Sequence, residues 1–216
     1  MGKQLIIFGA SDQAKVIYHA LPDKSICAGM VDVFGNPAFM EKFDRSYPLI
    51  GGLAEAEDVI GKGSYYGIAA IGDNTHRRKI YEKFAGRLEM VNVIHETAIL
   101  QDNLQIDRGC YIGPRAVMNH LVEIGDNVII NTAAVIEHDV KIGSHAHVGP
   151  GAVVAGNVEI GAGVFIGAGA VVIDGVRIGA GAVIGAGAVV IGDISAGATA
   201  VGTPARVLKK NDGNLA

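Results

Sequence analysis

Aliphatic residues recur at every sixth position through the C-terminal half of this chain. The run begins at Ile106 and continues at Ile112, Met118, Ile124, Ile130, Ile136, Ile142, Val148, Val154, Ile160, Ile166, Val172, Ile178, Ile184 and Val190. A second small or aliphatic residue follows four positions after each of these. A period of six excludes an amphipathic helix, whose period is 3.6, and predicts a parallel β-helix built from hexapeptide units.

Three flat sides of six residues make one coil, so the run from Ile106 to Ser195 predicts five coils of 18 residues. At a strand spacing of about 4.8 Å the resulting prism is about 24 Å long. Both repeating residues point inward, and the Gly and Asn residues between them take tight turns, often with positive φ. The narrow axis explains why Ala and Val, rather than aromatic residues, take these positions. The period does not determine the handedness of the coil.

The first ninety residues instead alternate short apolar strands with helices. Three strands end at Gly9, Asp32 and Gly72, helices are expected over 12–21, 53–60 and 74–85, and residues 35–48 read as a loop. A fourth strand, LEMVNVI, leads into the prism. This alternation predicts a small parallel sheet of mononucleotide-binding type, whose ligands lie at the carboxyl ends of the strands. No G-x-G-x-x-G motif follows the first strand, so the sequence gives no reason to expect a dinucleotide.

We therefore expect two domains and a short tail. Residues 1–94 form a Rossmann-like α/β domain, residues 95–208 form the β-helix, and residues 209–216 are a flexible tail. The net charge of −4 does not indicate the basic surface that nucleic-acid-binding proteins carry. The longest uncharged stretches, Ile160–Ile173 and Ile178–Gly192, are too short and too rich in glycine for membrane insertion. Two cysteines and no signal peptide favour a reduced, cytoplasmic setting.

His138 is the residue that the prism pattern singles out for chemistry. It lies with Asp139 in the exposed turn between inward Ile136 and Val140. An imidazole titrates near neutrality, and a neighbouring carboxylate orients it and raises its basicity, so His138 is a candidate general base. The alternative is an ordinary exposed turn histidine. His120 lies one coil earlier in the same column.

His147 is a second candidate, and it faces elsewhere. It stands between inward Ala146 and Val148, so it should project outward from a flat side. Nine residues, or one and a half sides, separate it from His138, so a joint site would need a second chain. The four histidines of the prism, His120, His138, His145 and His147, are separated by 18, 7 and 2 residues. The β-helix carbonic anhydrases instead have one histidine followed much later by two histidines five residues apart, so we expect no metal site here.

Over its whole length the chain resembles the NeuD/PglD family of bacterial sugar acetyltransferases. The resemblance rests on IIFGAS (6–11), AAIGDNTHRRKIYEKF (69–84), INTAAVIEHDVKIGSHAHVG (130–149), VVAGNVEIG (153–161) and VGTPAR (201–206). It implies a left-handed β-helix and a homotrimer. It also implies that acetyl-CoA lies between neighbouring prisms and that the N-terminal sheet holds a sugar nucleotide.

The resemblance also implies roles for individual residues. His138 matches the family's catalytic base and Asp139 its acidic neighbour, while His147 matches a contact to the acetyl thioester. Gly156, Ala168 and Ala186 match positions along the pantetheine. The matches to the sugar-nucleotide contacts are Ser11, Asp12, Gln13, Asp32, Val33 and Gly72.

Two departures from the family pattern affect the acceptor side. Many members have Gly-His where this chain has Asp12-Gln13, and paired acids where it has Asp32-Val33. We expect N-acetylation of a nucleotide-linked amino sugar, in surface polysaccharide or glycan synthesis. O-acetylation of sialic acid is the alternative, since that branch lacks the Gly-His pair and resembles the run RSYPLIGG (45–52). Remoter alternatives are a carbonic-anhydrase-like enzyme and a non-catalytic trimer. Against the second, this repeat lacks the regular array of threonines that structural β-helices carry on a flat face.

Overall fold

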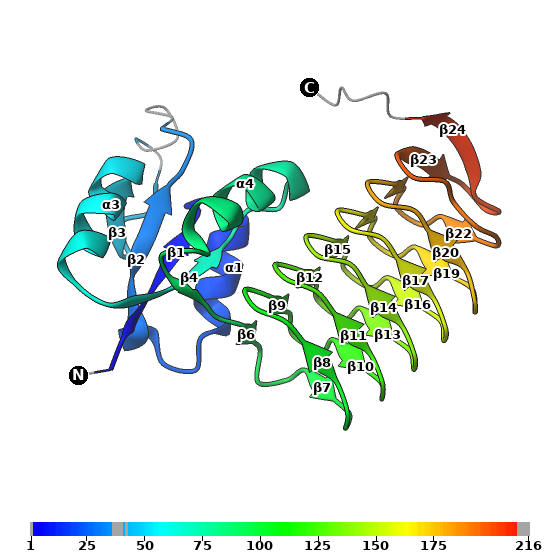
Figure 1. Cartoon of the computed structure of the whole chain (residues 1–216), viewed down its shortest axis with the longest axis horizontal. Helices are drawn as coiled ribbons and strands as arrows, with labels where there is room; N and C mark the ends of the chain where they lie inside the picture. Colours follow the sequence, from blue (N-terminus) through cyan, green and yellow to red (C-terminus); the bar gives the residue numbers. More distant parts are fainter. Residues whose placement is uncertain (1, 36–40, 42, 211–216) are drawn as a thin grey trace. The chain divides into compact units, whose positions relative to one another are not determined.

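The structure is a computed structural model, and it describes residues 2–35, 41 and 43–210. The chain divides into two compact units, Met1–Val93 and Ile94–Ala216 (Figure 1). Within the described residues, no helix combines the length and apolar character that crossing a membrane requires. Part of the loop expected over residues 35–48 lies outside the described residues.

A five-stranded parallel sheet forms the centre of the first unit. Its elements are β1 (Gln4–Phe8), α1 (Asp12–Ala20), the 3-10 turn η1 (Lys24–Ile26), β2 (Cys27–Asp32), β3 (Leu49–Gly52), α3 (Leu53–Lys62), β4 (Tyr65–Ala69), α4 (Asn74–Phe84) and β5 (Glu89–Met90). Apolar residues of the sheet and helices, among them Ile6, Phe8, Val31 and Phe84, pack into one core. The sequence pattern missed β3, and the expected fourth strand is divided between β5 and the next strand, β6 (Val93–Ile94).

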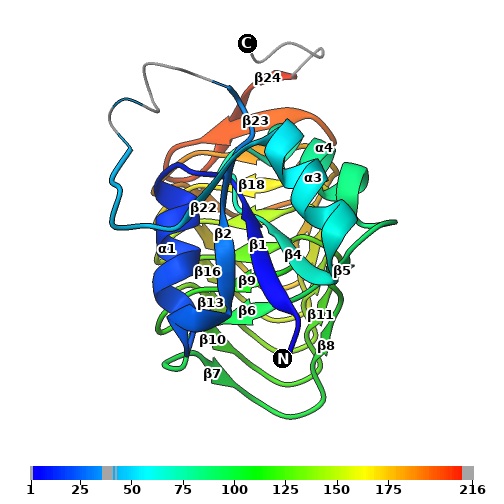
Figure 2. The same ribbon diagram turned by 90° about the vertical axis from the view of Figure 1, so that its left-hand side faces the viewer.

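The strand order is β3-β2-β1-β4-β5, so β1 lies between β2 and β4 (Figure 2). The chain first builds the sheet on one side of β1 and then crosses to the other side with β4. The carboxyl ends of β1 and β4 therefore flank a topological switch point, the place where open α/β sheets bind ligands.

The second unit is a prism with three parallel sheets, built from strands of mostly two residues. Its first sheet holds β6, β9 (Tyr111–Ile112), β12 (Ile129–Ile130), β15 (His147–Val148), β18 (Phe165–Ile166), β21 (Val183–Ile184), β23 (Ala198–Val201) and the antiparallel β24 (Arg206–Lys210). The second sheet holds β7 (Ile99–Leu100), β10 (Val117–Met118), β13 (Val135–Ile136), β16 (Val153–Val154), β19 (Val171–Val172) and β22 (Val189–Val190). The third holds β8 (Gln105–Ile106), β11 (Glu123–Ile124), β14 (Lys141–Ile142), β17 (Glu159–Ile160) and β20 (Arg177–Ile178).

The hexapeptide prediction is confirmed at the level of single side chains. Every predicted inward position from Cys110 to Ile194 is buried in one continuous core, and Ile106 packs against its end. The register also extends before Ile106, since Leu100 packs against the same core. The expected start of the repeat was therefore too late by at least one hexapeptide, or one side of the prism.

The turns have the geometry that the repeat predicts. Asn103, Asn127 and Asn157 have φ values of 58–60°, and a glycine takes the equivalent turn position in most later coils. Asn and Gly tolerate this left-handed region better than other residues do. Asp139 and His145 occupy it too, with φ values of 59° and 65°.

The C-terminal tail begins later than we expected. Lys209 and Lys210 belong to β24, whose backbone pairs with Ala198 and Thr199 of β23. The strand covers the edge that β23 would otherwise leave open, which explains why these residues are in the sheet. The remaining residues of the expected tail, 211–216, lie outside the described residues.

Candidate functional site

His138 lies at the corner of the prism where the chain passes from β13 to β14. Its Nδ1 atom is 2.9 Å from Oδ2 of Asp139, and both side chains are a little under half exposed. An ionised carboxylate can only accept a hydrogen bond, so Nδ1 carries the proton and Nε2 keeps its lone pair. This tautomer leaves Nε2 as the basic atom, as general-base catalysis requires.

The residues one coil before and one coil after His138 enclose its ring. The ring of His120 stacks on it, with centroids 5.7 Å apart and planes inclined by 19°. On the other side, a Cβ atom on Gly156 would lie 2.6 Å from Cε1 and 2.9 Å from Nε2 of His138. The φ angle of Gly156 is outside the left-handed region, so this position needs glycine because side chains, above all the His138 imidazole, lie against it.

A second carboxylate, which sequence reasoning did not single out, lies near Nε2. Asp174 Oδ2 would be 3.0 Å from the same Cβ position, so it is within about 6 Å of His138 Nε2. Asn157 donates a hydrogen bond of 3.1 Å to this oxygen. The available signal was the register, because Asp174 follows His138 by two coils of 18 residues.

His147 projects from the first sheet, but it is buried rather than exposed. The two residues that flank it, Ala146 and Val148, point into the core, so its direction is as expected. Only 6% of the residue is accessible. Its ring meets the edge of Phe165 with centroids 5.1 Å apart, and its Nε2 lies 3.2 Å from the amide nitrogen of Asn131. That amide nitrogen donates, so Nδ1 of a neutral His147 carries the proton.

The remaining prism candidates divide between two corners. Gly156 joins His138 and Asp139 at the corner between the second and third sheets. Ala168 follows β18 and Ala186 follows β21, so both lie exposed at the corner between the first and second sheets. The structure therefore does not unite these residues in one protomer, because the second sheet separates the two corners.

In the first unit the candidates gather at the carboxyl ends of three neighbouring strands. Ser11, Asp12 and Gln13 begin α1 after β1, Asp32 and Val33 follow β2, and Gly72 follows β4. The backbones of β1 and β4 are close here, since a Cβ on Gly9 would lie 2.3 Å from the Ala70 carbonyl oxygen.

Their side chains play different parts. Asp32 is only 6% exposed, and its Oδ1 accepts from the backbone N–H groups of Phe34 and Gly35 at 3.0 and 3.2 Å, so it shapes the turn after β2. Asp12 points into solvent, 3.5 Å from Nζ of Lys15. The buried Nε2 of Gln13 has no hydrogen-bond partner in the described part of the chain.

Arg77 was not foreseen as part of this region. It is fully buried in α4 and donates to the carbonyl oxygens of Ile71 at 3.1 Å and Gly72 at 3.3 Å. The guanidinium thereby holds the β4–α4 turn beside the switch point.

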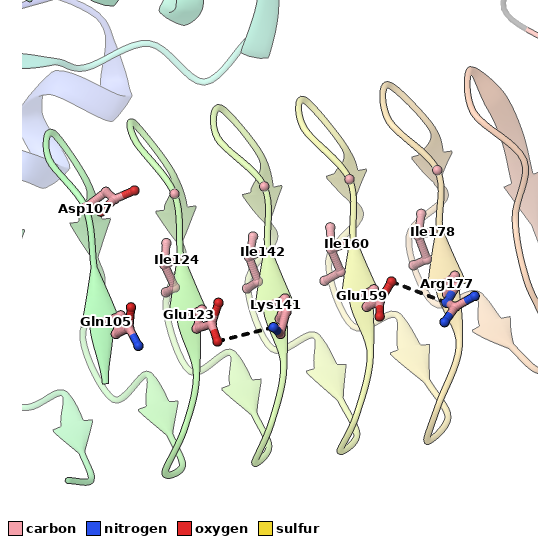
Figure 3. A pocket seen from close by; sticks show the side chains of 14 residues that line it. Gln105, Asp107, Glu123, Ile124, Lys141, Ile142, Glu159, Ile160, Arg177 and Ile178 are labelled. Atoms are coloured by element: carbon pink, nitrogen blue, oxygen red, sulfur yellow. Dashed lines mark ion pairs between the residues drawn. The ribbon is translucent and has the colours of Figure 1, made fainter. Parts of the chain in front are cut away.

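A groove of about 550 Å³ runs along the outer face of the third sheet, and none of the predicted site residues lines it (Figure 3). Charged side chains on successive strands line it and pair with one another. Lys141 Nζ is 3.3 Å from Glu123, and Arg177 Nε is 3.3 Å from Glu159. The groove holds no nucleophile or base next to a partner that could activate it, so we interpret it as a solvated face of ion pairs.

The chemistry of the cysteines argues against a covalent intermediate. Burial raises the pKa of the Cys110 thiol to about 12 and that of the Cys27 thiol to about 11. Thiolates are the nucleophilic form, so neither residue is activated near neutral pH. Among the residues that the structure describes, no group of three or more His, Cys, Asp or Glu side chains is arranged to hold a metal ion.

Comparison with family models finds two matches. The PglD N-terminal domain model matches residues 4–84, and the bacterial transferase hexapeptide model, of six repeats, matches residues 122–156 and 157–192. Comparison with curated proteins gives no match.

Several solved structures are similar over nearly the whole chain. PerB from Caulobacter crescentus, in complex with CoA and GDP-perosamine, is 33% identical with a TM-score of 0.88, covering 95% of this chain and 97% of that one. The acetyltransferase domain of PglB from Neisseria gonorrhoeae, in complex with acetyl coenzyme A, is 28% identical with a TM-score of 0.84, covering 96% and 100%. WeeI from Acinetobacter baumannii is 26% identical with a TM-score of 0.83, covering 96% and 100%.

These matches agree with the architecture described above. They confirm the expected fold class, an α/β parallel-sheet domain followed by a left-handed β-helix of hexapeptide repeats. The similarity includes both units and exceeds 30% identity over 95% of the chain. The chain therefore belongs to the PglD/NeuD family of hexapeptide-repeat sugar acetyltransferases.

Proposed function

We propose that this protein transfers the acetyl group of acetyl-CoA to the amino group of a nucleotide-linked amino sugar. The observation that carries the proposal is the His138–Asp139 pair, with 2.9 Å between Nδ1 and Oδ2 and a basic Nε2. The pair occurs in a chain 33% identical to PerB, whose structure holds CoA and GDP-perosamine.

The reaction needs one base and no covalent enzyme intermediate. The amine nitrogen attacks the thioester carbonyl carbon, and His138 Nε2 takes the proton that the nitrogen releases. The tetrahedral intermediate collapses as its C–S bond breaks, and the CoA thiolate leaves and takes up the proton. Asp139 stabilises the imidazolium that forms in between. A backbone N–H group or His147 stabilises the oxyanion.

The outer face of the second sheet supports assembly into a homotrimer. Its outward column is aliphatic on every coil, and consists of Ile99, Val117, Val135, Val153, Val171 and Val189. Ile99 is 54% exposed and Val171 is 36% exposed. A continuous apolar stripe of this kind marks an interaction surface, and the matching column on the third sheet is instead charged or polar.

A trimer with its second sheets facing the threefold axis would also complete the site. It would bring the corner with His138 and Gly156 of one chain against the corner with Ala168 and Ala186 of the next, the side on which His147 lies. Acetyl-CoA between the two corners would then contact all of these candidates. Acetyl-CoA and two reduced thiols are compatible with a cytoplasmic location.

The sugar-nucleotide contacts are proposed at the switch point. Gln13 and the β4–α4 turn at Gly72 would contact the nucleotide sugar, together with Ser11, Asp12 and Val33. Asp32 would act by shaping the turn after β2. The Asp12-Gln13 sequence keeps O-acetylation of sialic acid as the second candidate.

A direct assay decides between the two candidates. Purified protein is incubated with acetyl-CoA and, in turn, UDP-, GDP- and TDP-linked amino sugars, sialic acid and CMP-sialic acid, while free thiol is monitored. Mass spectrometry then distinguishes N- from O-acetylation. We expect thiol release with an amino sugar and a loss in kcat of roughly 10²- to 10⁴-fold in His138→Ala. Full turnover in a correctly folded His138→Ala protein would contradict the assignment of the base.

A further inference from the structure

We propose that His120 is a positioning residue that holds the imidazole plane of His138. The proposal rests on the proposed function, because it concerns the base assigned there. His120 belongs to the coil before His138, and no role in the reaction described above falls to it. It acts through His138 and does not need to touch either substrate.

The hydrogen bond to Asp139 alone does not fix the His138 ring. It restrains Nδ1 at 2.9 Å, but the ring can still tilt about that atom and carry Nε2 away from the amine. The side chain is 44% exposed, so the surrounding protein does not fill the space around it. A further restraint is needed to keep Nε2 in place.

His120 supplies that restraint on one face of the ring. The two rings are nearly parallel, inclined by 19°, with centroids 5.7 Å apart. On the other face, Gly156 leaves so little room that a Cβ there would be 2.6 Å from Cε1. The His138 ring therefore lies between the His120 ring and Gly156, and this position limits how far it can tilt.

The coil repeat explains how the two rings meet. Residues 18 apart occupy the same column, and adjacent coils are hydrogen-bonded through their turns, as where Asp139 N donates to His120 O at 3.3 Å. This bond ties the two turns together directly at the stacked pair. A flat ring with a polar edge suits an exposed position, because it packs by its face and still meets water at its edge.

Two single variants separate the ring surface from the imidazole chemistry. His120→Ala removes the surface, and we expect kcat to fall about tenfold with both KM values within about twofold, since a small displacement of a reacting atom is enough for such a loss. His120→Phe keeps a flat ring without nitrogen atoms, and we expect kcat within about twofold of the native protein. The matched control is Asp102→Ala, one coil before His120 in the same column, which should leave kcat unchanged.

A double variant tests whether His120 acts through His138. In the His138→Ala background there is no ring to position, so adding His120→Ala should leave the residual rate unchanged. A further fall would mean that His120 contacts the reaction itself, and would overturn the proposal. Failure of His120→Phe to restore kcat would also overturn it, as would native kcat in His120→Ala.

These outcomes are distinct from failure of the proposed function. If His138→Ala retains full turnover, the assignment of His138 as the general base is wrong, and this single variant is enough to show it. If His138→Ala is inactive but His120→Ala is fully active, the base stands and the positioning role falls. Circular dichroism and the thermal midpoint of each variant establish that it is folded.

Discussion

His138 Nδ1 lies 2.9 Å from Oδ2 of Asp139, the residue that directly follows it in the chain. Asp139 has a φ of 59°, so the carboxylate partner of the proposed base is also the residue that closes the turn. The orientation of the base is therefore determined within one turn of one coil. Substitutions at Asp139 act on the chemistry and on the backbone together, and a test has to separate the two.

Asp139→Asn separates them. Asn tolerates the left-handed conformation, so the thermal midpoint should stay within about 2 °C. Its amide can donate to Nδ1 and favour the tautomer with the proton on Nε2, which removes the basic atom. We expect kcat to fall roughly 10- to 100-fold, less than for a fully buried pair because both groups are partly solvated. Steady-state kinetics at saturating substrates measure this, and an unchanged kcat would show that Asp139 serves the turn alone.

Gly156→Ala should impair the enzyme by displacing the His138 ring. The new Cβ would lie 2.6 Å from Cε1 and 2.9 Å from Nε2, so the imidazole must move. We expect kcat to drop at least tenfold with little change in thermal stability. Gly192→Ala is the matched control, because Gly192 lies two coils further along the same column with nothing within 4 Å of a Cβ. Equal kinetics for the two variants would refute the steric argument.

His147→Ala should weaken acetyl-CoA binding more than acceptor binding. His147 lies on the first sheet, the side that a neighbouring chain would present to the thioester. We expect the apparent KM for acetyl-CoA to rise severalfold while the KM for the sugar changes less. Initial rates with each substrate varied in turn measure both constants, and the reverse pattern would count against the proposed role.

Val171→Glu should prevent assembly without unfolding the protomer. Val171 is 36% exposed and belongs to the aliphatic stripe, and a buried unpaired carboxylate there would oppose association. Light scattering should report a trimer, three times the chain mass of 22.3 kDa, for the native protein and a monomer of 22.3 kDa for the variant. Activity should be lost in parallel, because the proposed site needs two chains.

The control for this variant is Glu159→Gln on the charged third sheet. This sheet faces solvent in the proposed trimer, so the variant should remain trimeric and active. A native protein that is monomeric and active would overturn the shared site.

Thiol reagents should not inhibit the native enzyme near neutral pH. Burial raises the pKa of Cys27 to about 11 and that of Cys110 to about 12, so both remain protonated. Iodoacetamide at pH 7.5 should label neither residue in the folded protein and both in denaturant, as read by mass spectrometry. Because the unfolded chain loses these protons from about pH 9, the free energy of unfolding should fall as the pH rises above 9. Rapid labelling of Cys110 with loss of activity would contradict this account.

Much of the second unit could be predicted from sequence because a short period fixes side-chain direction. Ile136 and Val140 were expected to point inward, and both are fully buried, which places His138 and Asp139 at the corner between them. The column relation of His120, His138 and Gly156 followed from the same register. The stacking of the His120 and His138 rings did not, because it depends on side-chain torsions that spacing does not determine.

The failures have a similar cause. The direction of His147 was predictable, but its burial was not, since the period says which way a side chain points and not what packs around it. Its neighbour Asn131 lies 16 residues away, off the column of 18. In the first unit, β3 was missed because it is short and its sequence LIGG has two glycines, which weaken a strand pattern. The buried Arg77 was read as part of a charged helix.

The 18-residue coil places a strict condition on how such a gene can change length. Insertion of one complete coil before His120 or after Asp174 keeps every column in line, because each strand finds an equivalent partner. Loss of a single hexapeptide between His120 and His138 also keeps the aliphatic core in phase. It would nevertheless rotate His138 by one side of the prism relative to His120, and the protein would fold while its imidazoles stood on different corners. Natural length variants should therefore differ by whole coils around this column, and by any number of residues only beyond its ends.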